Sequence, residues 1–157
     1  MALLCLLAVG ADAGQPAMPA FEQYPAAVSG ATLQQVDLQS HPQAPTFRSR
    51  LQALEGRPAN FAGHYSVQYW GCGSGCQQFA IVDVTNGRVF MNEDWSASYG
   101  LCHRADSNLL IVNPGARAPA RMQSVYFYWD GSQLQQVWQG QLAEDETEPQ
   151  YRCAGEG

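Results

Sequence analysis

Residues 64–84 read HYSVQYWGCGSGCQQFAIVDV, and this stretch decides the fold. In its first part Tyr65, Val67 and Tyr69 occupy alternate positions, which places them on one face of a β-strand. Its last part, residues 79–84, is a short apolar run typical of a buried strand. Between these parts, glycines flank two cysteines that lie four positions apart. The stretch predicts two strands joined by a tight turn, and the role of the cysteines depends on the compartment.

The start of the chain has the pattern of a secretion signal. Residues 2–9 are apolar, and residues 11–13 form an A-x-A-like cleavage site. We expect residues 1–13 to be a signal peptide whose own start is truncated, because no Lys or Arg precedes Arg48. The apolar run is too short to span a bilayer. The pattern predicts a periplasmic or secreted protein whose mature chain does not insert into a membrane.

The charged residues restrict the kinds of partner. The chain has eight arginines, no lysine and a net charge of −6. Affinity for nucleic acids and for anionic membranes comes from clustered cations, so we expect neither as a partner. An acidic surface of this kind suits a basic protein partner.

Four cysteines remain after removal of the signal peptide, at positions 72, 76, 102 and 153. An even number in an exported chain predicts two disulfides, with three possible connectivities. We favour Cys72–Cys76 with Cys102–Cys153, because the Gly-Ser-Gly insert lets the chain bend back between the first two. A redox dithiol and a metal site are the alternatives at Cys72 and Cys76. Redox motifs normally hold two residues between the cysteines and begin a helix, and neither condition holds here.

The segments before the central stretch differ in composition. Residues 14–45 are rich in Pro, Gln and Ala, which predicts an irregular arm of limited order. A short helix is expected from Thr46, as its cap, to Leu54, with Leu51 and Leu54 facing inward. We expect residues 46–157 to form a single disulfide-stapled β domain.

Turn signals divide the rest of the chain into short strands. Asn86-Gly87 predicts a hairpin with a type I′ turn, in which both central residues need a positive φ. Residues 106–108 and 130–131 are two further turns, and residues 151–153 are a last short strand. About eight strands result. The expected fold is all-β, mainly an antiparallel meander arranged as two packed sheets or propeller-like blades, with one short N-terminal helix.

A catalytic set cannot be assembled from the sequence. His64 and His103 are candidate bases, which leaves a small exported hydrolase as an alternative function. However, a nucleophile, a base and an orienting group cannot be named together, and no serine lies in a Gly-x-Ser-x-Gly elbow. We therefore expect a protein that is not an enzyme and needs no metal or other cofactor.

A loop between two predicted strands is the main candidate for binding. Residues 92–99 carry two aromatic residues, two acids and two serines, and loops hold binding residues more often than frameworks do. The candidate partner-binding residues are Asp94, Trp95, Ser96, Ser98 and, as a second choice, Ser107. The alternative role for Trp95 is to cover the edge of the core. The loop 113–120, stiffened by its prolines, is a second candidate.

Four motifs carry a resemblance to known proteins. They are PANFAGHY at residues 58–65, WGCGSGC at 70–76, AIVD with Asn-Gly at 80–87, and SNLLIVN at 107–113. They resemble a group of small exported bacterial proteins built around an N-F-A-G-x-Y strand and a W-G-C-G-x-x-C turn. The resemblance covers residues 58–138, and its motifs are structural and imply no activity.

In size, export and β content the chain is also similar to the periplasmic immunity proteins of type VI secretion amidases. That family's inhibitory motif has no residue-by-residue match here. The resemblance implies an inhibitor that places a loop in the catalytic cleft of a secreted peptidoglycan amidase. In that role the serines of residues 92–99 bond to the enzyme's catalytic histidine and Trp95 anchors the rim. A cell-envelope structural or ligand-binding module is a further alternative.

Overall fold

The computed structural model of the chain describes residues 16–147 and 153–154. The predicted signal peptide, residues 1–13, lies outside the described residues. So do Tyr151 and Arg152, the first two residues of the predicted last strand.

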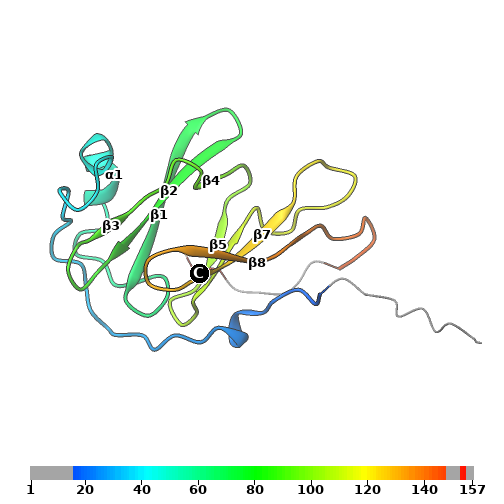
Figure 1. Cartoon of the computed structure of the whole chain (residues 1–157), viewed down its shortest axis with the longest axis horizontal. Helices are drawn as coiled ribbons and strands as arrows, with labels where there is room; N and C mark the ends of the chain where they lie inside the picture. The colour runs from blue at the N-terminus through cyan, green and yellow to red at the C-terminus, as the bar shows by residue number, and fades with distance from the viewer. Residues whose placement is uncertain (1–15, 148–152, 155–157) are drawn as a thin grey trace, which may run out of the picture.

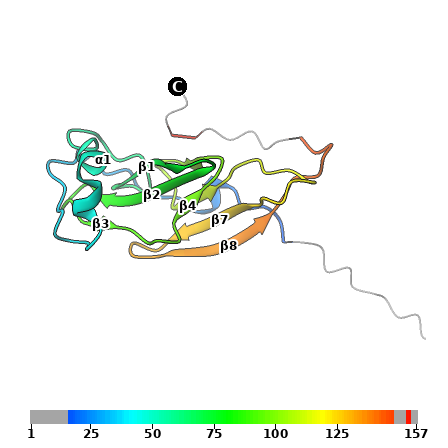
Figure 2. The ribbon, with the colours of Figure 1, turned by 90° about the horizontal axis from the view of Figure 1, so that it is seen from above.

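The structure consists of two four-stranded antiparallel sheets. In the first sheet, β2 lies between β1 on one side and β3 and β4 on the other. Its strands are β1 (Tyr65–Gly73), β2 (Cys76–Asp83), β3 (Val89–Phe90) and β4 (Ser96–Ala97). The second sheet is a simple meander of β5 (Leu101–His103), β6 (Leu109–Val112), β7 (Ser124–Trp129) and β8 (Leu134–Gly140). The predicted all-β fold with two packed sheets is confirmed (Figures 1 and 2).

The first sheet is buried on both faces. One face carries Trp70 and Val82, which pack against Leu51 and Leu54 of the helical region. The other face packs against the second sheet through Val67, Phe79, Ile81, Leu110, Val112 and Trp129. Burial on both faces explains why residues 79–82 of β2 form a continuous apolar run rather than an alternating pattern.

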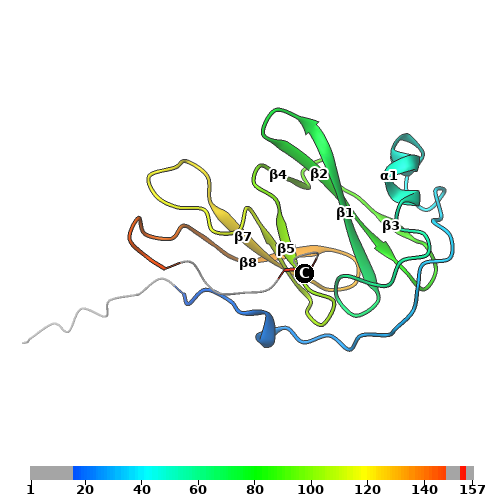
Figure 3. The ribbon, with the colours of Figure 1, turned by 180° about the vertical axis from the view of Figure 1, so that it is seen from behind.

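The N-terminal arm is irregular but packed along its length. Between residues 16 and 47, where the structure describes it, the arm forms no helix or strand apart from two 3-10 helices, η1 (Phe21–Gln23) and η2 (Ala44–Phe47). Its side chains nevertheless enter the core, with Phe21 3% and Leu33 1% exposed. Phe21 covers the outer face of the second sheet, and Leu33 the outer face of the first. Figure 3 shows the arm passing from one sheet to the other. The expectation of limited order did not anticipate this packing.

The one α-helix among the described residues is shorter than predicted and begins differently. Helix α1 spans Arg48–Gln52 and follows η2 directly. Thr46 lies inside η2 and caps nothing, so its predicted role as N-cap is wrong. Pro45 lies near the start of η2, and its ring fixes its φ at a helical value. The helical region therefore begins at Ala44, two residues before the predicted cap at Thr46. Leu51 and Leu54 are buried, as predicted.

The hairpin at Asn86-Gly87 exists, but its turn is not of type I′. Only Gly87 has a positive φ, of 78°, while Asn86 stays outside that region. The turn is stabilised by the Asp83 carboxylate, which accepts hydrogen bonds from the backbone and hydroxyl of Thr85. Gly87 also contacts the arm, since its carbonyl accepts a bond from the Asp37 N–H at 2.9 Å. This tertiary contact selects a wider turn than local sequence preference predicts.

Both predicted disulfides are present. Cys72–Cys76 closes the turn between β1 and β2 at the surface, so the glycine-rich run forms a disulfide-closed turn. Cys102 on β5 is fully buried and is bonded to Cys153. Next to that bond, the Ala154 N–H donates to the His103 carbonyl at 2.7 Å, so the described C-terminal residues lie along β5.

Candidate functional site

The predicted binding loop runs along the edge of the first sheet and contains β4. Asp94, Ser96 and Ser98 are exposed, whereas Trp95 is half-buried. The Trp95 ring stacks on Phe79, with ring centroids 5.5 Å apart and planes 12° from parallel. Trp95 therefore covers the edge of the core, which was the alternative considered for it.

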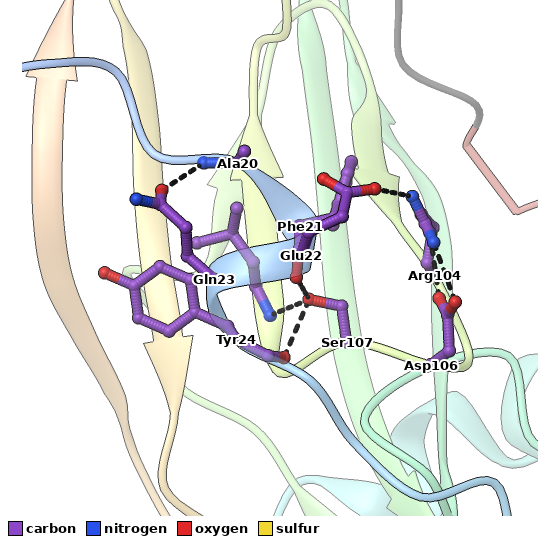
Figure 4. A network of polar contacts seen from close by, with 9 residues as sticks. Ala20, Phe21, Glu22, Gln23, Tyr24, Arg104, Asp106 and Ser107 are labelled. Atoms are coloured by element: carbon purple, nitrogen blue, oxygen red, sulfur yellow. Dashed lines mark hydrogen bonds and ion pairs between the residues drawn. The ribbon is translucent and has the colours of Figure 1, made fainter.

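Ser107 has a different position from the other candidates. It is completely buried in the turn between β5 and β6. Its hydroxyl lies 2.8 Å from the Phe21 carbonyl oxygen, to which it donates, and accepts a bond from the Leu109 N–H (Figure 4). Ser107 therefore cannot belong to a binding surface, because a partner cannot reach a completely buried side chain. Its turn-like sequence gave no sign that the arm, more than 80 residues earlier, covers it.

An ion-pair cluster lies beside Ser107 and fastens the arm to the same turn. The Arg104 guanidinium bonds to Asp106 at 2.7 Å and to Glu22 of the arm at 2.8 Å (Figure 4). The bonds from Arg104 lower the pKa of Asp106. The pKa of Glu22 is also lowered, first by a backbone hydrogen bond and then by Arg104. Because these charges pair with one another, the cluster holds the arm against the turn between β5 and β6.

The two candidate histidines lie in unlike surroundings. His103 is buried, and its Nδ1 is 3.0 Å from the Asn60 carbonyl oxygen. His64 is more exposed; its ring packs on Tyr65, and its Nε2 is 3.9 Å from Asp83. In the described part of the chain, neither ring forms a hydrogen bond with a serine or cysteine side chain. Within the same residues, no group of three His, Cys, Asp or Glu side chains is placed to hold a metal ion.

The burial of His103 predicts a dependence of stability on pH. Burial lowers the pKa of His103, so the folded protein resists its protonation. The unfolded chain takes up this proton near pH ~6.5 and binds more protons than the folded one. The free energy of unfolding should therefore fall as the pH drops below about 6.5.

His103→Asn removes the titration and retains a donor for the Asn60 carbonyl. We expect its melting temperature to change less than that of the wild type between neutral and mildly acidic pH. An unchanged slope in thermal melts would contradict this role for His103.

The most exposed aromatic side chain at the end of the predicted loop is Tyr99. It is 71% exposed, although its backbone is held firmly. The N–H groups of Ser98 and Tyr99 both donate to Asn113 Oδ1, at 2.7 and 2.9 Å. The Gly100 N–H donates to Gln77 Oε1 at 2.7 Å. Asn113 follows β6 and Gln77 lies on β2, so both sheets fix the loop that carries Tyr99.

A pocket of about 270 Å³ opens beside Tyr99. Its lining includes Tyr99, Asn113, Pro114, Arg117, Ala120 and Met122. The two loops proposed from the sequence, residues 92–99 and 113–120, therefore meet at one place. We call the region made of Ser98 and the six residues just named the Tyr99 surface. The sequence placed Tyr99 in the candidate loop but did not single it out, because exposure cannot be inferred from a tyrosine between strands.

No family model, no curated protein and no solved structure matches this chain. None of the helices in the described residues is long and apolar enough to cross a membrane. The two disulfides are compatible with export to an oxidising compartment. The function must be inferred from the geometry of the sites.

Proposed function

We propose that the protein is a non-enzymatic binding protein that engages a protein partner through the Tyr99 surface. The observation that carries the proposal is an aromatic side chain that is 71% exposed on a backbone held by three side-chain hydrogen bonds. Tyrosine is among the residues most enriched at energetic hot spots of protein interfaces. A loop that is already ordered loses little conformational entropy when a partner binds.

The surroundings of Tyr99 suit a protein interface. The adjacent pocket is lined by Pro114, Ala120 and Met122, which provide an apolar recess for a side chain of the partner. Arg117 at the same pocket is oriented by bonds to the carbonyls of Ala143 and Glu146. An apolar centre with polar groups at its margin is the usual composition of such interfaces.

Charge favours a basic partner. Glu93 and Asp94 are exposed on the same loop and form no ion pair within the described residues. The whole chain carries a net charge of −6. Complementary charge across an interface speeds association and disfavours wrong partners. A basic rim around the partner's binding site is the expected match.

The finer proposal is that the partner is a secreted peptidoglycan amidase and that the protein acts in the periplasm as an immunity protein. It rests on the signal-like start, the two disulfides and the resemblance described above. In this role Tyr99 enters or borders the catalytic cleft. Ser96 and Ser98, both exposed, are placed to hydrogen-bond to the enzyme. Trp95 contributes mainly by holding the loop against Phe79.

Replacing Tyr99 by Ala tests the surface. We expect Tyr99→Ala to weaken inhibition of the amidase about 30-fold, the effect of losing a hot spot of about 2 kcal/mol. Its melting temperature should stay that of the wild type, because the side chain is largely exposed. The measurement is the clearing of purified peptidoglycan sacculi by type VI amidases, with the protein added in increasing amounts. Val137→Ala, at an exposed apolar position on β8, is the matched control and should inhibit like the wild type.

Failure of the binding surface and failure of the amidase as partner give different results. If Tyr99→Ala inhibits as well as the wild type, the Tyr99 surface is not the binding site. If the wild-type protein leaves the clearing of sacculi unchanged with every amidase, the partner is not an enzyme of this class.

A further inference from the structure

A second pocket, of about 250 Å³, lies away from the Tyr99 surface. We call it the β3 pocket. Three segments that are distant in the sequence line it: the arm, β3 with the start of the next loop, and the turn between β7 and β8. The lining residues with chemical roles are His41, Arg88, Phe90, Asn92, Trp95 and Leu134.

Arg88 provides the positive charge of the β3 pocket. Its guanidinium carbon lies 5.1 Å from the centre of the Phe90 ring, over its face. Among the described residues, no carboxylate forms an ion pair with Arg88. Stacking on the ring orients the planar guanidinium and leaves its N–H groups available as donors.

Two further side chains present donors to the β3 pocket. His41 Nδ1 accepts a hydrogen bond from the Gln43 N–H at 3.2 Å, so the neutral ring carries its proton on Nε2. Asn92 Oδ1 accepts a bond from the Asp94 N–H at 2.9 Å. This bond orients the amide of Asn92 and leaves its NH₂ group available as a donor.

Two acceptors near the β3 pocket, Ser40 and Asp130, already take part in hydrogen bonds. Ser40 Oγ accepts from the Val89 N–H at 2.8 Å and donates to the Asp37 carbonyl at 2.6 Å. Asp130, in the bordering turn, accepts bonds from the backbone and hydroxyl of Ser132. Backbone hydrogen bonds, first from Gln133, lower the pKa of Asp130 to about 2. Among the residues that the structure describes, no acidic side chain lines the pocket itself. The charge of Arg88 and the donors of His41 and Asn92 therefore favour a ligand that supplies acceptors and a negative charge.

Part of the remaining wall of the β3 pocket is apolar and aromatic. Trp95 and Phe90 pack around Trp129. The centre of the Trp129 ring lies 6.2 Å from that of Trp95 and 5.2 Å from that of Phe90. Leu134 also lines the pocket. A flat apolar body therefore fits beside the donors, and the volume suits a molecule of about one ring.

From these features we infer that the β3 pocket binds a small aromatic carboxylate. The carboxylate receives hydrogen bonds from Arg88 and His41, and the ring lies against Trp95. The site shares no lining residue with the pocket at Tyr99, so the inference does not rest on the proposed function.

The probe for this site is benzoate, and benzamide and acetate are the comparison ligands. The three are titrated into the full-length protein, and binding is followed by calorimetry and by the NMR signal of the Trp95 indole. We expect benzoate to bind at least about tenfold more tightly than benzamide, because the charge-assisted bonds are lost with the amide. Acetate should also bind at least about tenfold more weakly than benzoate, because it lacks the ring that packs on Trp95.

Arg88→Gln should weaken benzoate binding by about tenfold or more, to the level of benzamide, and leave benzamide unchanged. Arg48→Gln, at an exposed arginine on α1 outside this pocket, is the control and should bind benzoate like the wild type. Equal affinity for benzoate and benzamide, an unchanged Arg88→Gln, or an equal loss in Arg48→Gln would each overturn the inference. So would the absence of benzoate binding at millimolar concentration.

Discussion

Replacing Gly87 by Ala is expected to lower the free energy of unfolding by about 3 kcal/mol or more. Gly87 has a φ of 78°, which costs an L-residue about 1–2 kcal/mol. An added Cβ would lie 2.1 Å from the Gln35 carbonyl oxygen and 2.9 Å from the Asp37 nitrogen. Both are backbone atoms, so relief requires the arm to move away from the hairpin. Overpacking of this kind adds about 1–3 kcal/mol.

Gly56→Ala is the matched control for Gly87→Ala. Gly56 has the same φ of 78°, but an added Cβ meets nothing within 4 Å. Gly56→Ala should lower the free energy of unfolding only by the cost of a positive φ in an L-residue, about 1–2 kcal/mol. Urea unfolding of both variants measures the difference, which reports the close approach of the arm to the β2–β3 turn. Equal losses in the two variants would mean that the arm does not constrain this turn.

Removing the disulfide between Cys102 and Cys153 is expected to cost about 4 kcal/mol of unfolding free energy in the Cys102→Ala, Cys153→Ala double variant. The bond closes a loop with a sequence separation of 51, so it strongly restricts the unfolded chain. Cys102 is fully buried, and the loss of its sulfur also leaves unfilled space next to β5.

The second disulfide provides an internal comparison. Cys72–Cys76 spans a separation of only 4, and Cys72 is exposed. The Cys72→Ala, Cys76→Ala double variant should therefore lose only about 2 kcal/mol. Denaturant unfolding of the two double variants under identical conditions gives both values. A loss at the short bridge equal to or greater than that at the long one would contradict this account, and would point to strain or packing at the β1–β2 turn.

Much of the β framework could be predicted because its signals are local. Alternation over Tyr65–Tyr69, the apolar run of β2 and the turns at residues 106–108 and 130–131 each depend on near neighbours in the chain. The disulfide pairing also followed from spacing. The turn at Gly87 shows the limit of such signals: the hairpin was predicted, whereas its type was wrong because the arm packs against it.

The candidate sites were predicted less completely. The loops 92–99 and 113–120 were both selected from the sequence, but their meeting at Tyr99 depends on Asn113 of one loop bonding to the backbone of the other. Trp95 and Ser107 were chosen by residue type, and both are held by the core. The β3 pocket was not predicted at all, because its lining comes from three distant segments.

The sequence by itself indicated most of the strands and turns, favoured the disulfide pairing that the structure has and fixed the acidic, lysine-free composition, since these depend on residue type and short spacing. Only the tertiary structure decided which polar and aromatic groups reach the surface. Ser107 is buried by Phe21, 86 residues earlier, and Tyr99 is held outward by Gln77 and Asn113. Exposure is the result of which distant segments cover a side chain, and no local pattern encodes that.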